Sequence, residues 1–195
     1  MGFRKEYHVF NTLYRRNGVS NSRLFLRLEK RIRLARNNDA SRDALPVLLK
    51  HMGFLQNTDN YFNYFDNLWL GGSPLITHVG DITPAYATLP AKAFEEIKTG
   101  LESRGFRIKV IFIMRDPIER CWSAVRMSIG KRIRNGELRF LNDEIQLLEE
   151  IFRSTICERR TRYEETVETL EKVFDSRNIF IVSMKILVSK TLSNL

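Results

Sequence analysis

Apolar residues recur along the chain with two different periods, which predict helices separated by short strands. Spacing typical of one helical face marks five segments: 23–37, 89–104, 117–129, 142–157 and 161–174. Extended or continuous apolar runs predict four strands: 7–10, 76–79, 107–114 and 178–182. The last two runs are typical of strands buried on both faces of a parallel sheet. This alternation indicates an α/β fold in which helices flank a mainly parallel sheet.

Two further helices follow from more local signals. The segment 59–70 is strongly aromatic and ends at Gly71–Gly72, so it fits a helix whose rings pack in a core. Ser41 is a candidate N-cap for a helix that carries Leu45, Leu48 and Leu49. The 195 residues suit one domain, 1–195, of ordinary size.

Charge is distributed unevenly along the chain. The net charge is +9, and residues 1–50 hold 12 Lys/Arg against 4 Asp/Glu, whereas the remaining residues hold 20 against 19. Such asymmetry predicts an anionic partner, either nucleotide phosphates, an acidic glycan, nucleic acid or a membrane surface, unless it marks only a solvated basic face. The base-stacking and groove-reading patterns of a dedicated nucleic-acid module are absent, so no specific nucleic-acid partner is expected.

Several other classes of protein are not expected. The apolar runs are far shorter than the roughly 20 residues of a transmembrane helix, and the first residues lack the apolar stretch of a secretory signal. Cys121 and Cys157 stand alone in the sequence, and three histidines at wide spacing do not read as a metal site. A reduced, cytoplasmic protein without a metal is the simpler expectation.

Candidate chemistry begins where the strand 107–114 ends. Arg115 follows that strand directly, and Asp116 and Pro117 suit the start of a helix. Because open α/β sheets bind ligands beyond the carboxyl ends of their strands, Arg115 is placed to bind a phosphate, with Ser123 as a hydroxyl donor. The residues alone also allow a surface Arg–Asp pair with an incidental serine.

The order R-D-P-x-x-R-x-x-S, here Arg115 to Ser123, resembles the 3′-phosphate motif of sulfotransferases that use 3′-phosphoadenosine 5′-phosphosulfate. The resemblance implies that Arg115 and Ser123 bind the 3′-phosphate of this nucleotide, while Arg120 supports the helix or loop. It also implies a P-loop-type three-layer domain. No metal cofactor is implied.

Two upstream segments strengthen the resemblance, because they occur in the order that the family has. The sequence KEYHVF at 5–10 is similar to a K-E-x-H-F-F segment, which implies that Glu6 is the catalytic base with His8 beside it. The sequence VGDITPAY at 79–86 is similar to a loop that borders the acceptor site. The chemistry agrees, since transfer to a hydroxyl needs a base, and an E-x-H pair on one side of a strand supplies one.

The chain also departs from the family pattern. The strand, glycine-rich loop and helix that cradle the 5′-phosphosulfate should precede KEYHVF, so we expect a chain truncated before this segment and after residue 195, without its first strand–loop–helix unit. Ile82 occupies the position of a lysine that contacts the reacting centre in glycan-modifying members. The acceptor, a glycan or a small hydroxylated molecule, is therefore left open.

The expected function is transfer of a sulfuryl group from 3′-phosphoadenosine 5′-phosphosulfate to a hydroxylated acceptor, with the activity of this truncated chain left open. One alternative is a non-catalytic module, derived from the same fold, that binds a nucleotide or another anion. A P-loop phosphoryl transferase is less favoured because the sequence has no Walker loop. The first function needs Glu6, His8, Arg115 and Ser123, whereas the anion-binding module would use Arg115, Ser123 and the basic N-terminal helix.

Overall fold

The computed structural model describes residues 6–14, 26, 29–30, 32–34, 45–73, 75–134 and 143–184. The chain divides into two compact units, Met1–Ile108 and Lys109–Leu195. The described residues are mostly helical, with one small parallel sheet, so the α/β class is confirmed in this coarse form. The single domain expected over 1–195 stays a prediction.

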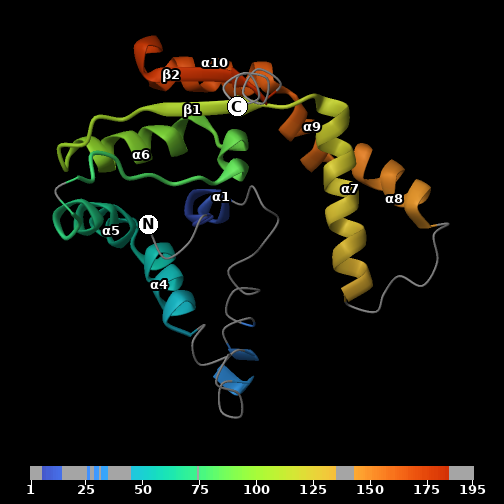
Figure 1. Cartoon of the computed structure of the whole chain (residues 1–195), viewed down its shortest axis with the longest axis horizontal. Coiled ribbons are helices and arrows are strands. Elements are labelled where there is room, and N and C mark those ends of the chain that lie inside the picture. Colours follow the sequence, from blue (N-terminus) through green and yellow to red (C-terminus); the bar gives the residue numbers. More distant parts are fainter. Residues whose placement is uncertain are drawn as a thin grey trace. The chain divides into compact units, whose positions relative to one another are not determined.

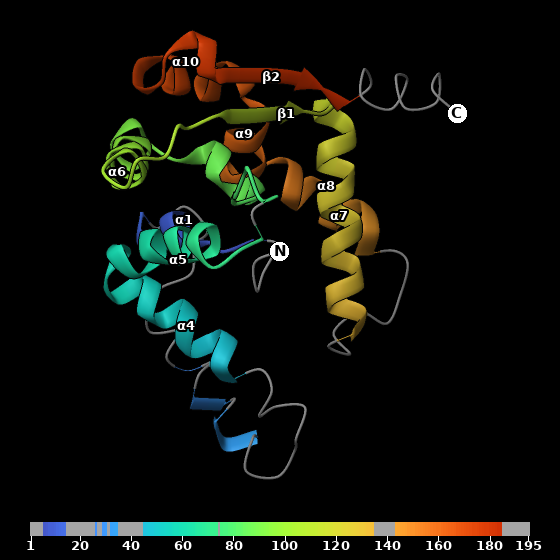
Figure 2. The same ribbon diagram turned by 60° about the vertical axis from the view of Figure 1, so that its left-hand side comes forward.

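The first unit is helical (Figures 1 and 2). Its elements are α1 (Val9–Leu13), α4 (Leu45–Gln56), α5 (Thr58–Leu70), the short 3-10 helix η1 (Pro84–Thr88) and α6 (Ala91–Glu102). In the helix predicted over 23–37, the described residues 26, 29–30 and 32–34 are helical and exposed. The rest of that segment and the proposed cap Ser41 lie outside the described residues.

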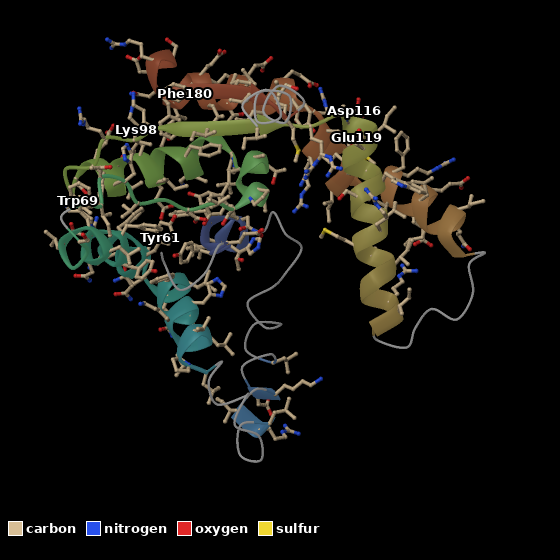
Figure 3. All side chains as sticks on the ribbon, viewed as in Figure 1. Tyr61, Trp69, Lys98, Asp116, Glu119 and Phe180 are labelled. Atoms are coloured by element: carbon tan, nitrogen blue, oxygen red, sulfur yellow. A yellow bond between two sulfur atoms is a disulfide. The ribbon has the colours of Figure 1, made fainter. Side chains whose placement is uncertain are left out.

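Aromatic rings form the core of the first unit, as the sequence of α5 predicts. Helical spacing puts Tyr61, Tyr64 and Phe65 on one buried face of α5, while Trp69 near its end is exposed (Figure 3). The ring centroids of Tyr61 and Phe65 lie 4.9 Å apart, and Tyr7 packs edge-on against both rings. The N-terminal segment is therefore held in place by burial of aromatic surface.

Two predicted strands in this unit are wrong. Residues 76–80 form neither helix nor strand, and residues 9–10 begin α1 instead of continuing an extended run. A short apolar run forms a strand only if a neighbouring strand can pair with its backbone. In the first unit the backbone N–H groups of Tyr7 and Val9 instead donate to side chains, those of Thr83 and Tyr86.

The second unit has a β–helices–β order, in which two adjacent parallel strands are joined by a helical connection (Figures 1 and 2). Its elements are β1 (Val110–Met114), α7 (Pro117–Arg134), α8 (Asp143–Phe152), α9 (Thr155–Thr161), α10 (Tyr163–Val173), the 3-10 turn η2 (Ser176–Asn178) and β2 (Ile179–Ser183). The register pairs Val110 with Ile179 and Met114 with Ser183. The parallel sheet that the sequence predicts is confirmed for these two strands.

Burial on both faces of the strands is not observed. Phe112 of β1 is 9% exposed, whereas its neighbours Ile111 and Ile113 are 67% and 52% exposed. Successive side chains of a strand point to opposite faces, so one face of β1 is covered and the other is open among the described residues. Phe180 of β2 is also 47% exposed and is labelled in Figure 3.

The helices of the second unit also correct two sequence expectations. The helix predicted over 142–157 is interrupted at Ser154, whose hydroxyl accepts the Cys157 N–H and starts α9 as a separate helix. The apolar spacing over 117–129 also does not predict burial of every apolar residue of α7, because Cys121 and Val125 are buried but Trp122 is 44% exposed. Positions 121 and 125 share a helix face, whereas position 122 is rotated by about 100° from it.

The contact between α5 and α6 depends on one glycine. A Cβ added at Gly100 of α6 would overlap the ring of Phe62, whereas a Cβ at Gly53 of α4 would meet only Asn60, at 4.0 Å. We expect Gly100→Ala to lower the free energy of unfolding by about 1–3 kcal/mol, because the ring or the helix must move. Gly53→Ala, the matched control, should raise it by up to about 1 kcal/mol. Urea unfolding monitored by circular dichroism measures both, and equal effects of the two variants would contradict this packing.

Candidate functional site

The segment 6–10 and the loop 81–86 are joined by hydrogen bonds, although they are far apart in the sequence. The Tyr7 N–H donates to Thr83 Oγ1 at 3.0 Å, across 76 positions of the chain. The Val9 N–H donates to the Tyr86 hydroxyl at 3.1 Å. The sequence predicts both segments as motifs of one site, and the structure brings them into direct contact.

Asp81 holds this loop in place through hydrogen bonds of its side chain. Its carboxylate accepts hydrogen bonds from the hydroxyls of Thr83 and of Tyr61, the latter at 2.9 Å, and it also interacts with the Tyr86 hydroxyl. Burial raises the pKa of the Asp81 carboxyl above its ordinary value, and these hydrogen bonds oppose the rise only in part. Sequence analysis missed Asp81 as a site residue, since its role depends on contacts with distant tyrosines.

Glu6 and His8 form a pair at the edge of this network. The distance from His8 Nε2 to Glu6 Oε2 is 2.9 Å, and each side chain is 39% exposed. The two side chains are therefore in contact with each other and still accessible to a ligand. Glu6 and His8 thus lie side by side, and their catalytic role stays a prediction.

The pair is formed by a turn and not by the extended strand that the sequence suggested. His8 has φ 56° and ψ 26°, the left-handed conformation, and it precedes the first residue of α1. Among the described residues it is the one non-glycine with positive φ. This conformation is uncommon outside glycine and recurs at functional sites, and here the Thr12 hydroxyl, which donates to the His8 carbonyl at 2.6 Å, supports it.

An adjacent carboxylate and imidazole can exchange a proton with a bound hydroxyl. The carboxylate of Glu6 can accept the proton, and His8 can orient the carboxylate or share the proton through their hydrogen bond. Ile82, in the loop that contacts this segment, is 64% exposed and provides neither charge nor a hydrogen bond. The site thus combines the Glu6–His8 pair, a candidate general base, with the apolar side chain of Ile82. The resemblance to glycan-modifying enzymes would place a lysine at this position.

In the second unit, Arg115 connects β1 to α7 as predicted. The Asp116 carboxylate accepts the N–H groups of Ile118 and Glu119 at 3.0 and 3.1 Å, so it is the N-cap of α7. Arg115 Nε lies 3.6 Å from Glu119 Oε2, and this nitrogen is buried without a hydrogen bond to any described residue. Arg115 therefore pairs with Glu119, while Asp116 caps the helix. Ser123 lies two turns into the same helix and is partly buried.

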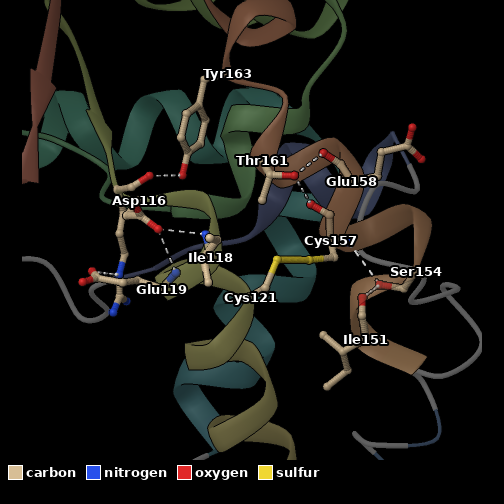
Figure 4. Close-up of a disulfide and its surroundings, with 11 residues drawn as sticks. Asp116, Ile118, Glu119, Cys121, Ile151, Ser154, Cys157, Glu158, Thr161 and Tyr163 are labelled. Carbon is tan, nitrogen blue, oxygen red and sulfur yellow. Dashed lines mark hydrogen bonds and ion pairs between the residues drawn. A yellow bond between two sulfur atoms is a disulfide. The ribbon is translucent and has the colours of Figure 1, made fainter. Parts of the chain in front are cut away.

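Two tethers hold α9 and α10 against the start of α7 (Figure 4). Cys121 of α7 and Cys157 of α9 form a disulfide, with their Cα atoms 6.4 Å apart. The Tyr163 hydroxyl donates to the Arg115 carbonyl oxygen at 2.7 Å, and its ring packs edge-on against Phe112. The expectation that the two cysteines stand alone is wrong, because their spacing in the sequence does not reveal that the two helices meet.

The disulfide removes the argument on which a reduced setting was based. Disulfides persist in oxidising compartments and are rare where glutathione keeps thiols reduced. None of the helices in the described part of the chain is long and apolar enough to cross a membrane. Within that same part, no group of three or more His, Cys, Asp or Glu side chains is arranged to hold a metal ion.

Of the four predicted residues, Glu6 and His8 are in contact in the first unit, whereas Arg115 and Ser123 belong to the second. The resemblance implies that all four belong to one site, and this stays a prediction. No protein-family model matches the chain. No curated protein and no solved structure matches it either.

The buried carboxyl of Asp81 makes the stability of the protein depend on pH. A carboxyl whose pKa is raised on folding, above the 3.8 of the unfolded chain, favours the folded state most fully below that value. This contribution is lost as the pH rises through the folded-state pKa. The stability of the wild type relative to Asp81→Asn should therefore decrease between about pH 4 and neutrality. Urea unfolding of both proteins across this range tests it, and a constant or increasing difference would contradict the assignment.

The disulfide makes a separate prediction about stability. Replacing Cys121 and Cys157 together by serine should lower the free energy of unfolding by about 2–4 kcal/mol, because the cross-link restricts the unfolded chain between two positions 36 residues apart. Denaturant unfolding with and without a reductant provides the measurement. The reductant should destabilise the wild type to the level of the double variant and leave the variant unchanged. Recovery of alkylated cysteines from the unreduced wild-type protein would contradict the pairing.

Proposed function

We propose that this chain is a sulfotransferase that moves a sulfuryl group from 3′-phosphoadenosine 5′-phosphosulfate to a hydroxylated acceptor. The observation that carries the proposal is the joining of the segments 6–10 and 81–86 around the Glu6–His8 pair. Two motifs that resemble one family separately are here in contact, as parts of a shared site would be. The contact between them consists of directed hydrogen bonds, because backbone N–H groups of one segment donate to side-chain hydroxyls of the other.

The chemistry that we propose for this pair is general base catalysis. The acceptor oxygen attacks sulfur as the bond from sulfur to the bridging oxygen of the nucleotide breaks. The acceptor proton moves to Glu6, and the nucleotide leaves as 3′-phosphoadenosine 5′-phosphate. His8 orients the carboxylate through the 2.9 Å contact. The partial exposure of both side chains gives an acceptor hydroxyl access to them.

For the nucleotide, we assign the 3′-phosphate to Arg115 and Ser123. Arg115 immediately follows β1, where parallel sheets of this kind bind ligands, and its buried Nε has no hydrogen bond among the described residues. The parallel pair β1–β2 with its helical connection supports the finer fold assignment, a P-loop-type three-layer domain. The acceptor class, a glycan or a small molecule, stays open because Ile82 brings no recognition group.

A second candidate function is a non-catalytic module that binds a nucleotide or another anion. The observation that favours it is the concentration of guanidinium groups at the start of α7, where Arg120 lies within electrostatic range of Arg115 and Arg160. Such a module needs neither the Glu6–His8 pair nor an acceptor. The two functions therefore differ in the effect of a change at Glu6.

The test uses the full chain and two matched pairs of variants. Glu6→Gln should lower transfer from labelled donor to a panel of hydroxylated acceptors by about 10²–10⁴-fold, with unchanged binding of 3′-phosphoadenosine 5′-phosphate. Arg115→Gln should weaken that binding about tenfold or more, because it removes charge-assisted hydrogen bonds. Glu95→Gln and Arg126→Gln, at exposed positions of α6 and α7, are the controls and should change neither quantity.

The outcomes separate the two candidates. Transfer that depends on Glu6 supports the sulfotransferase. Binding that depends on Arg115 without any transfer by the wild type supports the anion-binding module instead. Equal transfer by the wild type and Glu6→Gln contradicts the assignment of the base.

A further inference from the structure

A single hydroxyl group links the Asp81 carboxylate to the backbone between Glu6 and His8. The Thr83 hydroxyl donates to Asp81 Oδ1 and accepts the Tyr7 N–H, with 3.0 Å between the nitrogen and Thr83 Oγ1. Asp81 also interacts with the Tyr7 N–H directly. Because Tyr7 is the residue between Glu6 and His8, the carboxylate acts on the backbone that carries the pair.

The charge of Asp81 determines the direction of these hydrogen bonds. An ionised carboxylate accepts hydrogen bonds and cannot donate one, so the hydroxyl proton of Thr83 is directed toward Asp81. The lone pairs of Thr83 Oγ1 then remain for the Tyr7 N–H, which can only donate. A hydrogen bond to an ionised group is also stronger than one between neutral groups. The carboxylate therefore fixes Thr83 as an acceptor for the backbone.

The same loop also holds the backbone on the other side of His8. The Val9 N–H donates to the Tyr86 hydroxyl at 3.1 Å, and this hydroxyl interacts with Asp81 as well. His8 itself has φ 56°, a conformation that costs free energy in a residue other than glycine and persists only where surrounding contacts maintain it. The contacts of Tyr7 and Val9 can maintain it, because they hold the N–H groups immediately before and after His8.

The contact between Glu6 and His8 depends on this backbone conformation. In an extended strand, residues two positions apart lie on the same face but roughly 7 Å apart along the chain. The turn at His8 instead accompanies a distance of 2.9 Å between His8 Nε2 and Glu6 Oε2. A change in the backbone of residues 7–9 would therefore alter the pair without changing either of its side chains.

Tyr61 provides an internal comparison, because it bonds to the same carboxylate without reaching this backbone. Its hydroxyl donates to Asp81 Oδ2 at 2.9 Å and also interacts with the Tyr86 hydroxyl. Its ring lies edge-on to Tyr7 in the aromatic core, a contact that phenylalanine in its place would keep. Among the described residues, the Tyr61 hydroxyl accepts no backbone N–H of residues 6–10. Its loss should therefore lower stability and leave the acceptors of the N-terminal segment in place.

We propose that Asp81 is a positioning residue for the Glu6–His8 pair. Its carboxylate orients the Thr83 hydroxyl to accept the Tyr7 N–H, and this bond keeps the two residues of the pair in contact. Asp81 does not itself exchange a proton with the hydroxylated acceptor molecule. The effect of Asp81 on sulfuryl transfer rests on the proposed function, whereas its effect on the geometry of the pair does not.

Nuclear magnetic resonance of the full chain tests the geometric part with two variants and one control. Asp81→Asn replaces an acceptor oxygen by an amide group that donates, so the Thr83 hydroxyl loses its fixed direction. Thr83→Val keeps the shape of the side chain and removes the hydroxyl. The matched control, Tyr61→Phe, removes a hydrogen bond to the same carboxylate and keeps the ring.

The readouts are hydrogen exchange of the Tyr7 amide and the NOE between the amide and α protons of His8, which is strong at positive φ. We expect Asp81→Asn to accelerate exchange of the Tyr7 amide about tenfold relative to the control, because a hydrogen bond that protects it is weakened. Thr83→Val should change the exchange in the same direction. The His8 NOE should weaken in Asp81→Asn and stay unchanged in the control. Urea unfolding of each protein corrects the exchange rates for any loss of global stability.

Kinetic measurements on the same proteins test the catalytic part. Asp81→Asn should lower kcat per folded molecule about tenfold or more and change the acceptor KM less than about twofold, because a displaced base affects the transition state and not binding. Tyr61→Phe should keep kcat within about twofold of the wild type.

Several results would overturn the proposal. They are an unchanged Tyr7 exchange rate and His8 NOE in Asp81→Asn, effects of the same size in Asp81→Asn and Tyr61→Phe, or an unchanged kcat of Asp81→Asn when the wild type is active. If Asp81→Asn does not fold, Thr83→Val decides by the same criteria. A wild type that transfers no sulfuryl group would contradict the proposed function, while the resonance measurements would still decide whether Asp81 positions the pair.

Discussion

The candidate site in the first unit depends on the hydrogen bonds that side chains of residues 81–86 accept from the backbone of residues 7–9. A segment this short has no strand partner in the described unit, and its backbone donors need acceptors once they are buried. Thr83 and Tyr86 provide them, and Asp81 in turn fixes both hydroxyls. The Glu6–His8 pair is held at this junction, with His8 in a conformation that the surrounding contacts must maintain.

The start of α7 in the second unit depends on contacts between distant parts of the chain. The disulfide between Cys121 and Cys157 joins α7 to α9, and the Tyr163 hydroxyl donates to the Arg115 carbonyl oxygen. The Asp116 carboxylate accepts the first N–H groups of α7, so this helix begins almost directly after β1. These contacts together fix the position of the Arg115 backbone at the end of the strand.

Sequence patterns predicted the helices more accurately than the strands. The aromatic spacing in α5 and the cap–proline pair at Asp116–Pro117 are local signals, and both were confirmed. The strand predicted at 76–79 was wrong because pairing depends on a partner elsewhere in the chain, which an apolar run does not reveal. The exposure of Ile111 was missed for a similar reason, since a continuous apolar run predicts two covered faces whether or not a second layer covers them.

The sequence by itself suggested which residues carry the candidate chemistry, because the short motifs that contain Glu6, His8, Arg115 and Ser123 resemble those of one family. It also determined that β1 is followed directly by a capped helix. Only the tertiary structure decided that residues 7–9 meet the loop 81–86 and that Cys121 bonds to Cys157. The physical reason is range: caps and periodicity act within one or two helical turns, whereas these long-range contacts depend on how separate elements pack.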